Sequence, residues 1–233
     1  MRENIYYYLF TRCRRLLWNK PRALFLLPVI RRVWKHTLIG YVNLYQTYDA
    51  IAQIEKANVP GAIVEMGVWR GGCGAFMAWC AKKYTTQRTV WLFDSFEGLS
   101  PFSDEDSEKA AKKQRKGGKV FAAPQKDAEE IVLKLNVRER VKIVKGWFKD
   151  TVPETKQHIG KIALLRLDAD IYEPTKYCLN ELYDLVSPGG IIIIDDYGAW
   201  KGCNRAVYEF FAERGLDRPI YHYPYRGRAY FIK

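Results

Sequence analysis

Residues 62–72 read AIVEMGVWRGG, a short apolar run that ends in an acidic residue and a glycine-rich turn. The run predicts a strand buried on both faces, and glycines let the backbone turn tightly and pass close to a ligand. Glu65 suits a cationic amino-acid group better than a pyrophosphate, and the spacing is not the G-x-G-x-x-G of dinucleotide folds. Either this turn binds a ligand, or it serves only to reverse the chain.

Apolar runs and helical patterns alternate along the rest of the chain, so we predict a doubly wound sheet that ends in an antiparallel hairpin. The further strands are expected at residues 89–93, 141–145, 162–167 and 190–194, and the hairpin at 220–223 and 229–232. The helices are expected at residues 73–84, 127–135, 174–186 and 206–214. Ligands of such sheets bind at the carboxyl ends of the strands, which is where we look for chemistry.

The first 57 residues are predicted to form a basic, aromatic-rich helical arm, with Pro21 and Pro28 as breaks, ahead of a domain at 58–233. No acidic residue lies between Asn4 and Tyr48, so much of the net charge of +12 belongs to the arm. The arm could pack on the domain or on a second copy in a homo-oligomer. Residues 1–40 could instead contact an anionic membrane surface. Nucleic-acid binding is disfavoured because no recognised motif accompanies the charge.

The cysteine pattern and the early apolar run bear on the compartment. The five cysteines form no C-x-x-C pair, so they are interpreted as ordinary thiols in a reducing compartment. The run at 23–30 lacks a cleavage site and is shorter than the roughly 20 residues that span a bilayer. We therefore expect a cytoplasmic protein, either soluble or peripheral at the inner face of a membrane. The polar stretch at 100–119 is predicted to be a lid.

A second motif, DSFEGL at residues 94–99, follows the second expected strand. A carboxylate at this place can accept both ribose hydroxyls of S-adenosylmethionine (SAM) or of NAD, which makes Asp94 a candidate ligand together with its neighbours Ser95 and Phe96. The alternative is that Asp94 only caps a helix or forms the turn.

Acidic residues also end the fourth and fifth expected strands, in RLDADIYEPT at 166–175 and DDYG at 195–198. These strands are usually neighbours, so four carboxylates would converge at one edge of the sheet. Crowded like charges need a cation, and ligands that offer only oxygen suit a hard divalent ion such as Mg²⁺. The alternative is that these aspartates cap helices. The four are Asp168, Asp170, Asp195 and Asp196.

Together these motifs resemble the macrocin O-methyltransferase family, sugar O-methyltransferases of the TylF/MycF type. The similarity runs from about residue 60 to 211 and includes DSFEGL, RLDADIYEPT and SPGGIIIIDDY. It also includes CNRAV at 203–207, although the family often has arginine where Asn204 stands. The arm cannot be matched motif by motif.

The resemblance implies a Rossmann-like class I methyltransferase fold with a mostly parallel seven-stranded sheet, SAM as the methyl donor and Mg²⁺ held by acidic residues. Asp168, Asp195 and Asp196 match the family's metal positions. Glu65, Gly67 and Asp94 match its SAM-binding positions. The acceptor implied is a sugar-containing small molecule or a glycolipid.

The reaction would displace the sulfonium methyl with an oxygen nucleophile, which must first lose a proton or gain acidity from a metal. We expect the metal to chelate two vicinal hydroxyls and Asp168 or Asp170 to take the proton. Trp147 and Phe148 are expected either to flank the adenine or, alternatively, to pack in the core. The aromatic residues expected to line the site are Trp69, Tyr172 and Tyr197, whereas the histidines expected at the surface are His36, His158 and His222.

Three other functions share parts of this pattern. A nicotinamide-dependent oxidoreductase would also use Asp94 but would need a dinucleotide glycine motif and has no use for the acidic cluster. A catechol-type O-methyltransferase would offer vicinal hydroxyls on a phenol in place of a sugar. A SAM-binding protein at a membrane, without catalysis, is the non-enzyme alternative.

Overall fold

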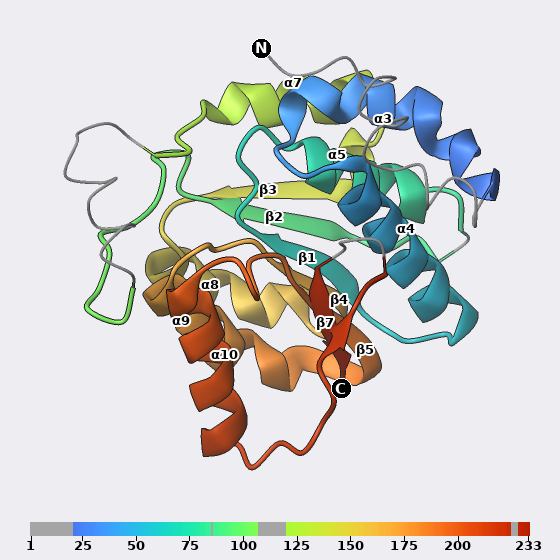
Figure 1. Ribbon diagram of the computed structural model, residues 1–233. Helices are drawn as coiled ribbons and strands as arrows, with labels where there is room; N and C mark the ends of the chain where they lie inside the picture. The colour runs from blue at the N-terminus through green and yellow to red at the C-terminus, as the bar shows by residue number, and fades with distance from the viewer. Residues whose placement is uncertain (1–20, 85, 107–119, 225–227) are drawn as a thin grey trace.

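The computed structural model describes residues 21–84, 86–106, 120–224 and 228–233, and places a seven-stranded sheet between two layers of helices (Figure 1). The strand order is β3-β2-β1-β4-β5-β7-β6, with β1 to β5 parallel and β7 antiparallel to β5 and β6. The predicted class I methyltransferase fold is therefore confirmed. The strands are β1 (Ala62–Met66), β2 (Val90–Asp94), β3 (Val141–Lys145), β4 (Ile162–Leu167), β5 (Val186–Ile194), β6 (Tyr221–His222) and β7 (Ala229–Ile232).

The α-helices within the described residues include one that the sequence pattern left unassigned, α8. Pro153 lies inside α8, and its missing N–H makes that stretch look unlike a helix. α9 begins two residues before Pro174, where a helix has no use for the N–H that proline lacks. The α-helices are α3 (Leu27–Val33), α4 (Tyr41–Lys56), α5 (Gly72–Ala81), α7 (Gln125–Lys134), α8 (Phe148–Ile159), α9 (Tyr172–Leu182) and α10 (Lys201–Glu213).

Two boundaries differ from the prediction in a way that matters for the sheet. The helix expected to run to residue 186 ends at Leu182 and is followed by a 3-10 turn, η4 (Tyr183–Leu185). β5 then begins at Val186, so Pro188 and Gly189 lie within the strand, at an irregularity in its pairing with β4. α10 begins five residues earlier than expected.

Alternate residues of the central strands pack into two cores, one on each face of the sheet. Ile63, Leu164 and Ile193 face the layer of α3, α4, α5 and α7. Val64 and Leu165 face the layer of α8, α9 and α10. Both layers are visible above and below the sheet in Figure 1. Because both faces are covered, β1, β2, β4 and β5 are largely apolar until they approach their carboxyl ends, whereas β3 carries Lys142 near its start.

The described part of the arm packs on the sheet rather than extending from it. It consists of η1 (Pro21–Leu26), α3, η2 (Trp34–His36) and α4, and its apolar residues belong to the same core as α5. A Cβ atom added to Gly72 would lie 2.5 Å from the backbone of His36, so a side chain at this position would push the arm away. The predicted domain boundary at residue 57 stays a prediction. The predicted arm also includes residues 1–20, which lie outside the described residues.

The carboxyl ends of β1, β2, β4 and β5 meet at one edge, and backbone hydrogen bonds continue past the strand ends. Asp168 donates its N–H to Met66 O, and Asp195 donates to Leu167 O, at 2.9 and 2.8 Å. Gly67 has a φ of +92°, and a Cβ there would lie 1.9 Å from Asp168 O. Glycine is therefore required at the point where the β1 turn crosses the β4 turn.

Candidate active site

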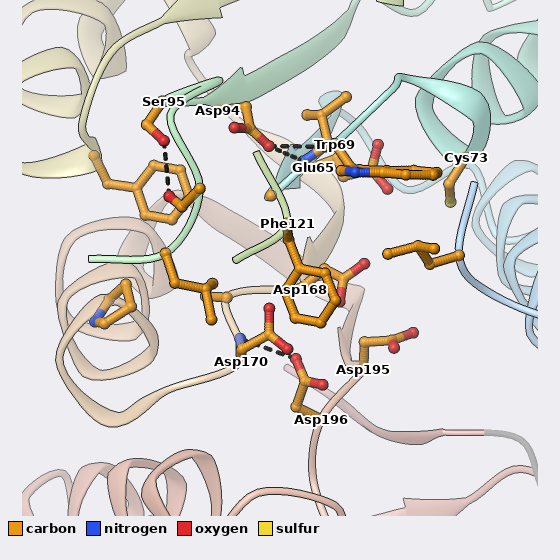
Figure 2. Close-up of a pocket in the computed structure, with 18 of the residues that line it drawn as sticks. Glu65, Trp69, Cys73, Asp94, Ser95, Phe121, Asp168, Asp170, Asp195 and Asp196 are labelled. Atoms are coloured by element: carbon orange, nitrogen blue, oxygen red, sulfur yellow. Dashed lines mark hydrogen bonds between the residues drawn. The ribbon is translucent and has the colours of Figure 1, made fainter. Parts of the chain in front are cut away.

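A cavity of about 1150 Å³ opens at this edge of the sheet. Its walls come from the glycine-rich turn after β1, the turns after β2, β4 and β5, the start of α8 and α9, and the segment at 37–43 that leads into α4. Figure 2 shows carboxylates from four strand ends around this space. The position agrees with the expectation for an open α/β sheet.

Asp94 ends β2 and accepts hydrogen bonds from three backbone amides. Its Oδ2 accepts from Val68 N at 2.7 Å and from Trp69 N at 2.8 Å, and its Oδ1 accepts from Phe96 N at 2.6 Å. Burial raises the pKa of Asp94, and these three amides oppose that rise. The turn-forming role considered for Asp94 is therefore real, and its carboxylate also lines the cavity.

Three residues whose amides donate to carboxylates of the site have left-handed backbone conformations, although none is glycine. Trp69, Phe96 and Asp170 have φ values of 52°, 57° and 59°. The first two donate to Asp94, and Asp170 N donates to Asp196 Oδ2 at 3.0 Å. Such conformations cost roughly 1 kcal/mol or more each and persist where the surroundings enforce them, as at functional sites.

Glu65 lies on β1 beside Arg166 of β4, its partner in the strand register. Arg166 Nη1 donates to Glu65 Oε1 at 3.0 Å, and both side chains are 1% exposed. Burial raises the pKa of Glu65 to about 7, although Arg166 opposes the rise. The other oxygen, Oε2, receives no hydrogen bond from a nitrogen or oxygen of the described residues. Glu65 also lines the cavity, so it can accept a further donor.

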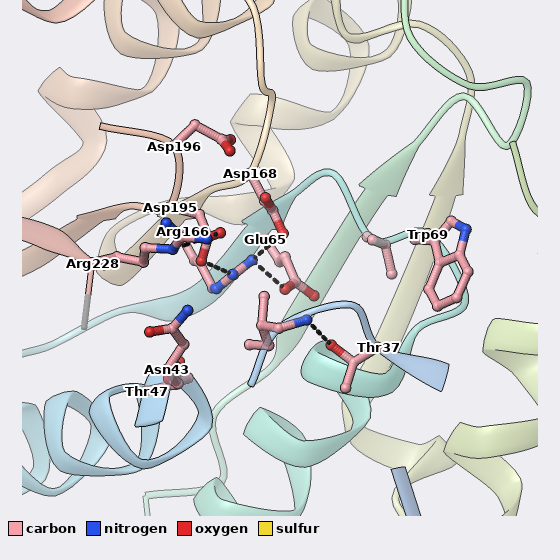
Figure 3. Close-up of polar contacts among 12 residues, drawn as sticks. Thr37, Asn43, Thr47, Glu65, Trp69, Arg166, Asp168, Asp195, Asp196 and Arg228 are labelled. Carbon is pink, nitrogen blue, oxygen red and sulfur yellow. Dashed lines mark hydrogen bonds and ion pairs between the residues drawn. The ribbon is translucent and has the colours of Figure 1, made fainter. Parts of the chain in front are cut away.

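Arg166 lies between Glu65 of β1 and the acidic cluster at the ends of β4 and β5 (Figure 3). Its Nη1 also donates to Asp168 Oδ2 at 2.8 Å, and its Nη2 donates to Asp195 Oδ1. One guanidinium group therefore donates hydrogen bonds to carboxylates from β1, β4 and β5. An arginine is tolerated inside a parallel sheet only because each of these groups offsets the cost of its burial.

Asp195 is paired with a second arginine as well, since Arg228 Nε lies 3.3 Å from its Oδ2. Burial and the neighbouring Asp168 raise the pKa of Asp195 to about 6, and the two arginines oppose this rise. The pKa of Asp196 is also raised, by burial and by Asp168, Asp170 and Asp195. Like charges are therefore crowded here in spite of the arginines.

Asp168, Asp195 and Asp196 each offer an oxygen within 4.8 Å of the others. Four carboxyl groups, these three and Glu65, face two guanidinium groups, so the set carries more negative than positive charge when all four are ionised. None of the three caps α9 or α10; the first amide of α9, Tyr172 N, donates to Asp106 Oδ1 instead. A compact set of oxygen ligands with excess negative charge suits a hard divalent cation.

The structure brings most of the predicted site residues to this cavity. Phe96 and the aromatic rings of Tyr172 and Tyr197 are not part of its wall. Phe96 contributes its amide only, Tyr172 OH donates to Glu209, and the ring of Tyr197 lies tilted beside that of His222. His36, His158 and His222 also lie away from the cavity wall. The predicted residues in the wall are Glu65, Gly67, Trp69, Asp94, Ser95, Trp147, Phe148, Asp168, Asp170, Asp195 and Asp196.

Several residues of the site were not singled out from the sequence. Arg166 could have been identified from the sequence, because a lone arginine in the apolar run IALLRL of β4 must have buried partners. Arg228 and the arm residues have none, since nothing in their local pattern shows that residues far apart in the chain meet. The arm residues in the wall are Thr37, Leu38, Ile39, Gly40, Val42 and Asn43.

The predicted lid at 100–119 lies partly outside the described residues, which end at Asp106 and resume at Val120. The described ends are held: Leu99 N donates to Val120 O at 3.0 Å, and Phe102 stacks near Trp200. Leu99 and Phe121, which flank the segment, line the cavity together with Trp200, so apolar surface lies here in its wall. The lid itself stays a prediction.

Comparison with known proteins places this geometry in a family. The family model described as macrocin-O-methyltransferase (TylF) matches residues 31–231, which includes α4 and the hairpin. The match is longer than the stretch in which motifs could be recognised. The resemblance drawn from the motifs is confirmed.

Three proteins similar to this chain are likewise named as O-methyltransferases. An 8-demethyl-8-(2,3-dimethoxy-alpha-L-rhamnosyl)-tetracenomycin-C 4'-O-methyltransferase of Streptomyces olivaceus is 36% identical over 79% of this chain and 71% of its own length. The mycinamicin III 3''-O-methyltransferase of Micromonospora griseorubida is 33% identical over 79% of this chain and 74% of its own. The structure of the O-methyltransferase NovP matches with a TM-score of 0.76 and 33% identity, over 85% of this chain and 82% of that one.

Proposed function

The chain belongs to the macrocin-O-methyltransferase (TylF) family and is a SAM-dependent O-methyltransferase, and we propose that it methylates a hydroxyl of a sugar or glycoside with the aid of a divalent cation. The observation that carries the proposal is the set of three aspartates at the strand ends, beside a pocket that can hold the donor.

The donor would lie across the ends of β1 and β2. Asp94 accepts a ribose hydroxyl at Oδ1, which binds one amide and can accept a further donor, whereas Oδ2 already accepts from two amides. Glu65 Oε2 accepts from the ammonium of the methionine part, and Trp69 and Trp147 provide aromatic surface for the sulfonium and the adenine. Gly67 lets this turn pass directly against the turn after β4.

Asp168, Asp195 and Asp196 would hold Mg²⁺, which when bound lowers the pKa of an acceptor hydroxyl. Arg166 orients Asp168 and Asp195 by hydrogen bonds. Asp168 or Asp170 takes the hydroxyl proton as the oxygen attacks the methyl carbon. The carbon–sulfur bond breaks, the bonding electrons stay on sulfur, and S-adenosylhomocysteine leaves with the methylated acceptor.

The apolar ends of the lid segment support a sugar-sized acceptor. Leu99, Phe121 and Trp200 lie in the wall of the cavity, as do Asp170 and Glu173. Aromatic and aliphatic surface beside carboxylates suits a sugar, whose C–H faces are apolar and whose hydroxyls need hydrogen-bond acceptors.

The metal is tested by removing it. We expect activity to be lost in excess chelator and to return when Mg²⁺ is added back, with methyl transfer from labelled SAM as the measurement. Full activity in excess chelator would exclude a metal from the mechanism.

The acceptor is tested by a screen. Free, nucleotide-linked and lipid-linked sugars are compared with catechols as acceptors under the same conditions. Methylation of a sugar class supports the proposal, whereas methylation of catechols alone would replace the sugar with a phenol. SAM binding without transfer to any acceptor would favour the non-catalytic alternative.

A second proposal concerns the surface of the arm, which would contact an anionic membrane and so suit a glycolipid acceptor. Leu24 and Phe25 are 48% and 45% exposed, and the basic residues Arg31, Arg32 and Lys35 are exposed on the same segment. No helix in the described part of the chain is long and apolar enough to cross a bilayer. Sedimentation with anionic and neutral vesicles tests this; no binding to anionic vesicles would end the proposal.

A further inference from the structure

Arg228 reaches the acidic cluster from the start of β7. Its Nε lies 3.3 Å from Asp195 Oδ2, but this nitrogen makes no hydrogen bond within the described residues. The pair is therefore held by charge without the alignment of a hydrogen bond. The side chain is 35% exposed and lines the cavity.

Gln46 of the arm helix α4 holds the backbone of Arg228 on both sides. Gln46 Nε2 donates to Arg228 O at 2.9 Å, and Arg228 N donates to Gln46 Oε1 at 2.8 Å. Gln46 is 3% exposed, so these two bonds form in a buried setting, where a lost partner is costly. The arm thus fixes the point from which the Arg228 side chain extends.

The two arginines on Asp195 differ in kind. Arg166 is 1% exposed and donates hydrogen bonds to three carboxylates. Arg228 makes one ion pair at the edge of the cavity (Figure 3). A positive charge so close to Asp195 repels any other cation that approaches the same carboxylate, and a partly exposed side chain can give way to it.

We propose that Arg228, positioned by Gln46, competes with the divalent cation for Asp195 and so sets how tightly the active site binds its metal. The inference rests on the metal site proposed above. It makes the arm helix part of the reaction centre, because the arm determines where the competing charge lies.

The test is calorimetric titration of Mg²⁺ alone into the full-length protein at low ionic strength. We expect Arg228→Met to bind Mg²⁺ roughly tenfold more tightly than the wild type, because a repelling charge has been removed. Arg228→Lys, which keeps the charge, should stay close to the wild type. Gln46→Ala should change affinity in the same direction by about threefold, since the arginine is only loosened.

A double variant separates positioning from general damage. If Gln46 acts through Arg228, Gln46→Ala should have no further effect on Mg²⁺ affinity in the Arg228→Met background, although it should still lower the melting temperature. Gln53→Ala is the matched control: Gln53 is exposed on the same helix and its side chain donates to its helical neighbour Asp49 rather than to the hairpin, so both readouts should stay unchanged.

The sign of the effect decides the inference. If Arg228 only supported the structure of Asp195, its removal would weaken Mg²⁺ binding, so weaker or unchanged binding by folded Arg228→Met would overturn the proposal. Arg228→Gln provides a second uncharged variant if Arg228→Met does not fold. A wild type that binds no Mg²⁺ would overturn both this inference and the metal-dependent function.

Discussion

The carboxylates at the ends of β2 and of β4 and β5 lie at the same edge of one sheet but are stabilised in different ways. Asp94 is balanced by three backbone amides, which carry no net charge. Asp168 and Asp195 are balanced by the guanidinium groups of Arg166 and Arg228. Amides can keep their bonds while a neutral ligand adds its own, which suits ribose hydroxyls. Ion pairs can be exchanged for another cation, which suits a metal site.

The largest expected effect comes from replacing Arg166, the arginine that three carboxylates share. Arg166→Met leaves three carboxylates without their shared partner, and breaking such a buried set should lower the free energy of unfolding by about 3–5 kcal/mol, measured by urea unfolding at pH 7. Arg214→Met is the control, since Arg214 forms an exposed pair with Asp184 and should cost less than about 1 kcal/mol. Equal losses in both variants would mean that the cluster is not held by charge.

The second effect concerns the reaction. Asp195→Asn keeps the shape of the side chain and one acceptor oxygen but loses its charge, so kcat should fall about a hundredfold with Mg²⁺ present. Chelator should then have little further effect. The dissociation constant for SAM should be unchanged, because the donor is expected at β1 and β2. Wild-type kcat in this variant would remove Asp195 from the metal site.

The third effect concerns SAM binding by Asp94 at the end of β2. Asp94→Asn replaces one acceptor oxygen with an NH₂ group, which faces amides that also donate, so SAM should bind about thirtyfold more weakly. The affinity for Mg²⁺ should not change. If Asp94→Asn and Asp195→Asn each weakened both ligands equally, the two sets of carboxylates would not be separate.

The smallest effect is a dependence on pH. Burial raises the pKa of Glu65 to about 7, so its carboxylate forms as the pH rises towards 7, while the ammonium of SAM, an α-amino group that titrates at about pH 8, is still mostly protonated. SAM affinity should therefore rise by up to about fivefold between pH 6 and pH 7. Glu65→Gln should bind more weakly with little dependence on pH in this range. A wild-type affinity that falls over the same range would contradict the role given to Glu65.

The sequence predicted the parts of this site that follow from the sheet. Apolar runs located β1 to β5 approximately, and acidic residues at the end of β2 and directly after β4 and β5 had to meet because parallel strands end at one edge. The sequence could not show that Arg228 reaches Asp195, because that contact depends on how α4 and the hairpin pack in three dimensions. It also could not reveal α8, whose proline and polar residues conceal a helix that the sheet holds in place.

The two hydrogen bonds between Gln46 and Arg228 join residues that are 182 positions apart. Closing that loop costs only slightly more entropy than closing the 101-residue loop between Glu65 and Arg166, but it also needs both α4 and β7 in place, so we expect it to follow the pairing of the parallel strands. We expect a folding intermediate with the parallel strands in place to hold Glu65, Asp94 and Arg166 before Arg228 reaches the cluster. The enzyme would then acquire its donor pocket earlier than its finished reaction centre, and refolding followed by SAM fluorescence displacement and by activity should show two different rates.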